Sequence, residues 1–367
     1  MATPGETGVR QASGLSWQAP RALEFWSVVA HAGMVYARTE AGIFWWDDDN
    51  RLWTGVKHNP FDVYCMRLAA GAAANHPIYA LEGHFLFASH DGCRSWERRP
   101  LPVRFVPGTQ TAVAADPFEP YTVYLFGQLP AADAPREHAQ YALYWSFDGG
   151  RTWDGPLTAG AEGRTLASGP HGFLAVASDP ALYGSGGLFM TTGRGLYRWF
   201  GLPFAGAGAE PLIELPASFA GAIVATAVGP RAGNPLAIAV HAEGDTPSQH
   251  LQVSLDLGKN WSVRDPYPHK FMIDDLLYVD DLLFVKLVHW DPAQGGKMQG
   301  AILMSRDDGL SFIDVTAPDM VLPLTLQMAS AWPREGLAVS PTHLYVMSRG
   351  LGAHSVALDT LRKVASR

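Results

Sequence analysis

The sequence predicts an all-β fold, a seven-bladed β-propeller with four-stranded blades, from three observations. An octapeptide of the pattern Ser-x-Asp-x-Gly-x-Ser/Thr-Trp/Phe recurs along the 367 residues. A strand-like run precedes each copy, and an apolar run that ends in a turn lies between copies. The spacing of these repeats is close to one seventh of the chain. The copies lie at 89–96, 146–153, 254–261 and 305–312.

The residue types of the octapeptide suit a tight turn between two strands. The Asp side chain can accept hydrogen bonds from N–H groups of its own turn, the Gly supplies a positive φ, and the aromatic residue can pack on the neighbouring sheet. Two copies depart from the pattern, with Cys93 in place of a Gly and Asn260 in place of a Ser or Thr. A decayed copy lies at 46–53, where three adjacent carboxylates could bind a cation, although we favour a solvated turn.

These repeats resemble Asp-box (BNR) repeats, the hairpin signature of sialidases, xyloglucanases and photosystem II assembly factors. The resemblance implies a β-propeller and covers nearly the whole chain as repeats. Sialidase activity is not carried over, because no Arg-Ile-Pro segment follows the N-terminus and no Tyr–Glu nucleophile pair can be placed. Xyloglucanases would need a second propeller, and photosystem II factors usually carry a leader sequence, which we do not find here.

The number of blades follows from the spacing of the aromatic residues that close the octapeptides. One repeat takes about 52 residues, and the interval from Trp153 to Trp261 is about twice as long. The run Gly195–Trp199 restores the repeat missing there, and 336–358 supplies a seventh. Small residues in three apolar runs, at 112–115, 175–178 and 225–228, suit innermost strands around a channel. The expected blades of this single domain cover approximately 24–55, 62–99, 110–157, 165–215, 221–264, 271–315 and 327–367, and 9–17 is expected to add the outermost strand of the last blade.

The composition restricts the possible partners and the cellular location. A net charge of −8 and a pI of about 5.9 argue against nucleic acid, since phosphate contacts need clustered Lys and Arg. The sequence shows neither a charged leader before an apolar core nor a run of about 18 apolar residues, so we expect a cytoplasmic protein without a membrane partner. Cys65 and Cys93 are expected at opposite ends of one blade, which disfavours a disulfide.

Long loops indicate where a ligand would bind. In a four-stranded blade, the octapeptide turns share one end of the ring with the turn that leaves the innermost strand. We call this the octapeptide end, and the opposite side the loop end. Three long loops are expected at the loop end, at 128–140, 241–250 and 289–299. Functional residues often lie on loops of a rigid scaffold, so we expect a ligand site there; the alternative is that the loops only cover the channel mouth.

Polar residues at the start of these loops form the candidate site. Histidine titrates near neutrality, a carboxylate can be its acid–base partner, and Arg can hold an anion or stabilise developing negative charge. The histidines could also hold a metal, but they lack a fixed short spacing, so no metal site is predicted. Asp274 and Asp275 are neighbours on a strand, so at most one should face the channel. The candidate catalytic residues are His241, His289, Glu82 and His84, and the candidate substrate-binding residues are Arg38, Arg194, Arg349, Tyr64 and Asp62.

Three classes of function are compatible with this pattern. The preferred class is an enzyme that acts on a small-molecule or sugar-like metabolite by acid–base chemistry of the hydrolase, lyase or cyclase type. It needs no cofactor, since the sequence has no phosphate-binding Gly-rich loop, no His-Glu-x-x-His and no Cys-x-x-Cys. The alternatives are a non-catalytic scaffold or assembly factor that binds a protein, and a carbohydrate-binding module. The enzyme is preferred because long loops concentrate at one end, while apolar surface for a protein partner is not evident from the sequence.

Overall fold

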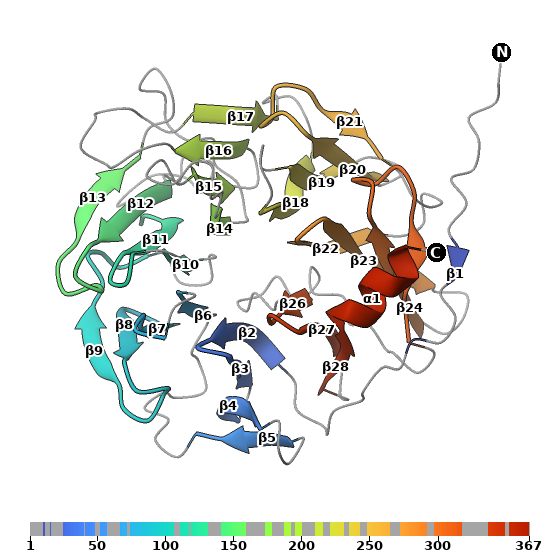
Figure 1. Ribbon diagram of the computed structural model, residues 1–367. Coiled ribbons are helices and arrows are strands. Elements are labelled where there is room, and N and C mark those ends of the chain that lie inside the picture. The colour runs from blue at the N-terminus through green and yellow to red at the C-terminus, as the bar shows by residue number, and fades with distance from the viewer. Residues whose placement is uncertain are drawn as a thin grey trace.

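The computed structural model shows a ring of antiparallel sheets around a central channel (Figure 1). It describes residues 10–11, 15, 25–39, 41–47, 52–56, 67–71, 74–105, 111–116, 119–130, 141–158, 173–177, 187–191, 195–199, 210–215, 221–230, 235–242, 248–264, 272–291, 297–317, 337–348 and 352–366.

Seven sheets are formed by the described strands, and within each sheet the strands follow one another in chain order from the channel outward. The first three sheets are β2 (Phe25–His31), β3 (Met34–Thr39), β4 (Gly42–Asp47) and β5 (Leu52–Gly55); β6 (Arg67–Ala70), β7 (Ile78–Glu82), β8 (Phe85–Ser89) and β9 (Glu97–Pro100); and β10 (Ala112–Ala115), β11 (Val123–Gln128), β12 (Tyr141–Ser146) and β13 (Asp154–Leu157). The next two are β14 (Phe173–Ala177), β15 (Gly187–Thr191), β16 (Gly195–Trp199) and β17 (Glu210–Glu214); and β18 (Gly221–Val228), β19 (Leu236–Ala242), β20 (Ser248–Ser254) and β21 (Ser262–Val263). The last two are β22 (Met272–Val279), β23 (Leu282–Asp291), β24 (Lys297–Ser305) and β25 (Ile313–Asp314), with β1 (Arg10–Gln11) at the edge; and β26 (Leu337–Val339), β27 (His343–Ser348) and β28 (Gly352–Ala357), followed by helix α1 (Leu358–Ala365).

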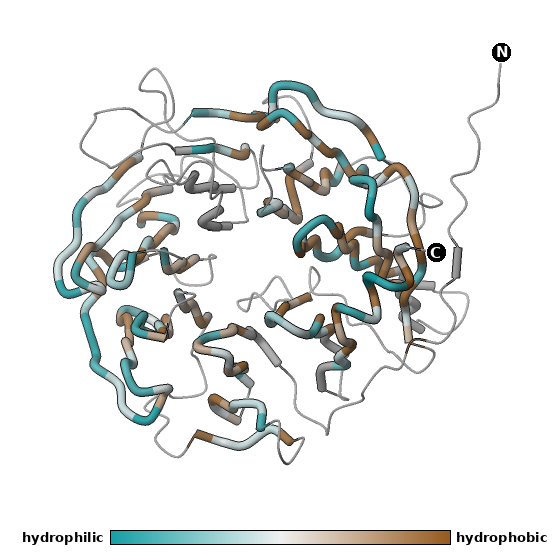
Figure 2. The backbone as a smooth tube through the Cα atoms, in the orientation of Figure 1, coloured by the Kyte–Doolittle hydropathy of each residue, from teal (hydrophilic) through white to brown (hydrophobic). Residues whose placement is uncertain are grey.

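The innermost strands close the ring. Each of β2, β6, β10, β14, β18, β22 and β26 contacts the next one, and β26 contacts β2. The core lies between neighbouring sheets; for example, Phe284 and Ile302 of one sheet pack with Leu344 and Val356 of the next. Figure 2 shows hydrophobic residues recurring along the inner strands, whereas the outer turns of the sheets β6–β9 and β10–β13 are mostly hydrophilic. The fold is therefore an all-β propeller, as the repeats predicted.

The number of complete blades is smaller than expected. Six sheets have at least four strands, whereas the sheet β26–β28 has three among the described residues, so seven complete blades are not confirmed. The expected pairing of 9–17 with the last blade is wrong for the described pair Arg10–Gln11, which lies parallel to β25 in the preceding sheet. Without β1, the short β25 would be the outermost strand of that sheet, and its outer edge is free for pairing. Helix α1 was not predicted, although Leu358 and Leu361 give it a buried face.

The octapeptides join the third and fourth strands of their sheets. The N–H of Gly149 in one octapeptide donates to the carbonyl of Tyr121, in the turn that leaves the innermost strand β10. This bond confirms that octapeptides and inner-strand exit turns share one end of the ring. The opposite end carries the starts of the innermost strands, including that of β22.

Candidate functional site

The structure describes only some of the predicted site residues. Arg38 lies on β3 with 1% exposure, and its guanidinium donates to the carbonyl of Gly42 at 3.3 Å, so it stabilises its own hairpin. Glu82 ends β7, and His84 lies in the following turn, where its Nδ1 is buried without a described hydrogen-bond partner. For His289 the structure gives the backbone of β23 only. Outside the described residues lie Arg194, Arg349, Tyr64 and Asp62.

The candidate acid–base residues are not brought into one described contact. Glu82 and His84 lie on the sheet β6–β9, whereas His241 is the penultimate residue of β19, in a sheet three places further along the chain. Their roles as catalytic residues stay predictions. A different set of charged residues does meet, on the first half of β22 toward the loop end.

A β-bulge on β22 gathers two carboxylates around a lysine. The register with β23 shifts between Ile273 and Asp275, so Asp274 is the extra residue. Lys286 of β23 pairs in register with Asp275, and its Nζ donates to Asp274 Oδ2 at 2.5 Å. The expectation that the two neighbouring carboxylates face opposite ways is wrong, because the extra residue interrupts the alternation of the strand. Asp274 and Lys286 form an ion pair whose side chains are both 0% exposed.

Asp275 connects this ion pair to the three-stranded sheet. Its Oδ1 accepts the N–H of Leu276, and its Oδ2 accepts the N–H of Leu337 at the start of β26, both at 2.8 Å. Protein atoms surround the carboxyl densely, although the residue keeps part of its surface exposed. Burial raises the pKa of Asp275 to about 6, against the opposing charge of Lys286 and the bond from Leu337. This carboxyl can therefore gain or lose a proton near neutral pH.

The neighbouring sheet adds a polar link to the same bulge. The side-chain oxygen of Gln249, at the start of β20, accepts the N–H of Ile273. The Gln249 amide nitrogen is 3.5 Å from Nδ1 of His241, which is half-buried. We call His241, Gln249, Asp274, Asp275 and Lys286 the bulge cluster. It spans two sheets, contacts a third, and combines a buried Lys–Asp ion pair with a carboxyl whose pKa is raised toward neutrality.

Lys286 was missed at the level of sequence, although the sequence contains a signal for it. The strand Leu282–Val288 is apolar apart from this residue. A charged side chain within a run that is buried on both faces needs a counterion, because an isolated buried charge is strongly unfavourable. The partner could not be chosen from the sequence, since the bulge that turns Asp274 toward Lys286 has no clear mark there.

The octapeptide turns use their polar residues internally. In the turn 146–153, Ser146 Oγ donates to Asp148 Oδ1 at 2.8 Å and accepts the N–H of Gly150 at 2.6 Å. The N–H and the hydroxyl of Thr152 donate to the Asp148 carboxylate at 2.9 and 2.7 Å. Burial alone would raise the pKa of Asp148, but these hydrogen bonds outweigh it and lower the pKa to about 2.

The other three turns repeat this arrangement. Asn260, the departure from the pattern, donates from Nδ2 to Asp256 Oδ2 at 2.6 Å, and so replaces a Ser or Thr hydroxyl. Two consecutive residues have a positive φ in every turn, where the sequence predicted one Gly. These pairs are Gly92–Cys93, Gly149–Gly150, Leu257–Gly258 and Asp308–Gly309. The closing aromatic residues pack into the cores shared with the preceding sheets, as predicted.

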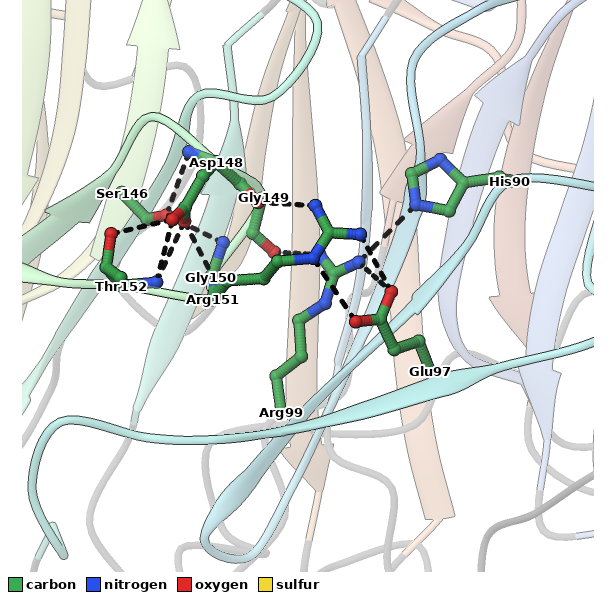
Figure 3. A network of polar contacts seen from close by, with 9 residues as sticks. All are labelled: His90, Glu97, Arg99, Ser146, Asp148, Gly149, Gly150, Arg151 and Thr152. Carbon is green, nitrogen blue, oxygen red and sulfur yellow. Dashed lines mark hydrogen bonds and ion pairs between the residues drawn. The ribbon is translucent and has the colours of Figure 1, made fainter.

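A second polar network joins two of these turns (Figure 3). Arg99 of β9 is 2% exposed and donates to the carbonyl of Gly149 and to Glu97. Arg151 donates to the same Glu97 at 3.0 Å, and His90 lies 3.5 Å from Arg99. Gly149 has a φ of +75°, and a Cβ there would lie 2.6 Å from Arg99 Nη1, so another residue would strain the turn and displace Arg99. The network fixes the sheet β6–β9 to the sheet β10–β13.

The part of the chain that the structure describes holds no group of three or more His, Cys, Asp or Glu residues arranged to bind a metal ion. Among the same residues, no helix is both long and apolar enough to cross a membrane.

Comparisons with known proteins give the fold and no family. No family model matches the chain, and no curated protein matches it. Among solved structures, the chain is similar to YCF48 bound to a D1 peptide, with a TM-score of 0.57, 14% identity, and coverage of 97% of this chain and 99% of that one. It is also similar to a PL25 ulvan lyase bound to -[GlcA(1-4)Rha3S]-, with a TM-score of 0.53, 11% identity, and coverage of 95% and 99%.

A third similar structure is the extracellular domain of a hybrid two component system from B. thetaiotaomicron. The TM-score is 0.56 at 11% identity over 94% of this chain, which spans 40% of that longer chain. The similar structures thus include a lyase and a peptide complex on one fold, and such low identities carry the fold alone.

Proposed function

We propose that this protein is an enzyme that acts on a small-molecule or sugar-like metabolite at the loop end by cofactor-independent acid–base chemistry. The bulge cluster is the observation that carries the proposal. It lies in the half of β22 nearer the loop end. Two of the long loops expected there are shorter than the sequence predicted, because paired strands extend into 241–250 and 289–299. Titratable groups with shifted pKa values beside a fixed charge are typical of catalytic sites, although structural ion pairs share this property.

The roles follow from the environment of each group. Asp275, with its pKa of about 6, is the general acid or base, since efficient proton transfer needs a pKa near the working pH. Lys286 holds its charge in place through Asp274 and can stabilise negative charge that develops nearby. His241, at the edge of the cluster, is the second group that exchanges protons. The further catalytic candidates of the proposed site are His289, on β23 of the same sheet, and Glu82 and His84 from another sheet. Its substrate-binding candidates are Arg194, Arg349, Tyr64 and Asp62, whereas Arg38 bonds its own hairpin and is left out.

A uronate-containing glycan is the first ligand to test. The ulvan lyase of similar fold was solved with a repeat of glucuronate and sulfated rhamnose. Such a ligand carries carboxylates and sulfates that Arg and Lys recognise. If the protein binds the glycan without turning it over, it is a carbohydrate-binding module. Binding and product formation should therefore be measured separately.

The test compares wild-type protein with Asp275→Asn and His241→Ala on this glycan, with product formation followed by reducing-end release and by ultraviolet absorbance of an eliminated sugar. We expect each variant to lose on the order of 10²-fold in turnover. The acidic limb of the pH profile near pH 6 should vanish in Asp275→Asn only. Asp281→Asn, an exposed carboxylate at the opposite end, is the matched control. Unchanged turnover and pH profile in Asp275→Asn would remove this residue from the mechanism.

The finer assignment of the fold is part of this proposal. We infer that the octapeptides are Asp boxes, and that β26–β28 is a seventh blade, because β26 contacts the innermost strands on both sides. A crystal structure with another number of blades would contradict this inference. Cytoplasmic location stays a prediction, and secretion of the protein by its native cell would contradict it.

A non-catalytic scaffold that binds a protein is the second candidate. The YCF48 structure contains a bound D1 peptide and matches nearly the whole chain. The surface that favours this candidate lies at the other end of the ring.

A further inference from the structure

The octapeptide turns present a repeated pair of side chains to solvent. The second and sixth residues of each turn are exposed, and each turn has one Arg or Lys among them. The other residue of the pair is aromatic or aliphatic in every turn. The pairs are His90 with Arg94, Phe147 with Arg151, Leu255 with Lys259, and Leu310 with Arg306. A chain with a net charge of −8 thus carries one cation on each of these four turns.

The Asp carboxylates of these turns are occupied by hydrogen bonds, so an incoming ligand can still bind the Arg and Lys side chains. Each turn Asp accepts hydrogen bonds from its own Ser and from the seventh residue of its turn. Arg151 pairs with Glu97, and Arg306 with Asp281, but all four side chains are about half exposed. Such exposed pairs contribute about 0–1 kcal/mol, so a carboxylate from a partner can replace them at little cost.

Exposed apolar residues concentrate at the same end. Of the large hydrophobic residues that are exposed in the described part of the chain, Phe147, Leu255 and Leu310 lie in octapeptide turns. Tyr121, 43% exposed, lies in the turn that binds Gly149, and Leu52 lies within the decayed octapeptide at 46–53. Only Val263 lies elsewhere, on an outer strand. The expectation from sequence that apolar surface is not evident does not hold at this end.

Two neighbouring turns combine these features in one rigid place. The ring of His90 lies 5.9 Å from that of Tyr121, and Phe147 follows in the turn that Tyr121 binds. Arg99 contacts both turns, as Figure 3 shows. In addition, Trp153 Nε1 donates to the carbonyl of Pro100 at 3.3 Å. We call His90, Arg94, Tyr121, Phe147 and Arg151 the aromatic–arginine patch. Tyr and Arg on a preorganised surface are the residues that dominate protein interfaces.

We propose that the aromatic–arginine patch docks an acidic segment of a partner protein that also carries apolar side chains. Carboxylates of the segment would bind Arg94 and Arg151, and an apolar side chain would cover Tyr121 and Phe147. An anionic membrane is the less suitable partner, because the net charge of −8 and the exposed Glu97 would be repelled by a negative surface. This surface is independent of the bulge cluster, so either proposal can fail alone.

The probe is a fluorescein-labelled 12-residue peptide of alternating Glu and Leu or Phe, with a Lys version as the charge control. Fluorescence anisotropy should show binding of the acidic peptide, weakened by salt, and weaker binding of the Lys peptide. We expect Arg94→Glu with Arg151→Glu to lose about tenfold or more in affinity, and Tyr121→Ser with Phe147→Ser to lose as much. The matched control is Leu255→Ser with Lys259→Glu, the same chemical change on another turn, which should bind as wild type does.

Arg94→Glu alone tests the patch in a variant that should keep its fold. Arg94 forms no ion pair among the described residues, so thermal unfolding of this variant should match wild type. The proposal is overturned by absence of acidic-peptide binding to the wild-type protein, by equal loss in the control variant, or by equal binding of the Lys peptide. Vesicles of phosphatidylserine and phosphatidylcholine form the last arm. Vesicle binding that the patch variants abolish, without peptide binding, would assign the surface to a membrane instead.

Discussion

Replacement of Lys286 by Met tests the ion pair at the centre of the bulge cluster. The Lys286 and Asp274 side chains are both 0% exposed, so Lys286→Met leaves a buried carboxylate without its counterion. Removing one partner of a buried pair costs about 3–5 kcal/mol, because the remaining charge loses its compensation. Met fills most of the space of the lysine stem, which keeps the contribution of a cavity small. We therefore expect the free energy of unfolding to fall by about 3–5 kcal/mol at pH 7.

Urea unfolding followed by both circular dichroism and tryptophan fluorescence measures this loss. With a slope of about 3 kcal/mol per M, the midpoint should fall by about 1–2 M. A variant that lacks both charges separates a charge effect from a packing defect.

The double variant Lys286→Met with Asp274→Leu is the matched control. It removes both charges, and an apolar pair in place of a buried ion pair is often neutral or stabilising. The double variant should therefore recover most of the stability lost in Lys286→Met. A single variant within about 0.5 kcal/mol of wild type, or a double variant no better than the single one, would refute the interpretation of this pair as buried and mutually dependent.

Three further predictions concern the hydrogen-bonded carboxylates. Asp275 has a pKa of about 6 in the folded protein, above its unfolded value, so its contribution to stability is full below about pH 4 and is lost as the pH rises through 6. The fall in stability between pH 4.5 and 7.5, measured by urea unfolding, should therefore be smaller in Asp275→Asn. An unchanged fall would exclude Asp275 as its source. Asp148→Ala should cost about 1 kcal/mol with little effect on activity, since the N–H groups it leaves can partly turn to water; a loss above about 3 kcal/mol in thermal or urea unfolding would contradict this. Thr152→Asn should be nearly neutral, because Asn260 already fills the equivalent place, whereas Thr152→Ala should lose part of what Asp148→Ala loses, since it removes only the hydroxyl bond to Asp148; equal losses in both Thr152 variants would contradict the equivalence.

The strands were predictable because their signal is local and repeated. The runs before the octapeptides became third strands, and the run without an octapeptide became β16. The turns were predictable in their hydrogen bonds but not in full, since Cys93 and Leu257 adopt a positive φ that their residue types disfavour. Four well-placed hydrogen bonds in each turn can offset that strain. Local chemistry therefore gave the repeat, and tertiary structure decided its exceptions.

The candidate site was much harder to predict, for a geometrical reason. Residues at equivalent places in different blades are tens of residues apart in sequence, and small changes of register decide whether their side chains meet. One extra residue at Asp274 brought two carboxylates to Lys286, against the alternation expected of a strand. Arg38, expected to reach a ligand, bonds its own hairpin. Such outcomes depend on bulges and on neighbouring sheets that single-strand patterns do not describe.

The two ends of the ring differ in the hydrogen bonding and the pKa of their carboxyl groups. At the octapeptide end the carboxylates are saturated by hydrogen bonds, with pKa values lowered as for Asp148, so their charge is fixed over the physiological range. What such a surface offers is shape, cations and apolar side chains, which suit recognition of a partner. At the bulge cluster one carboxyl has its pKa near neutrality, held there by burial against the charge of Lys286. A group in that state can exchange a proton, so the chemistry that we propose and the docking that we propose lie at opposite ends of one ring.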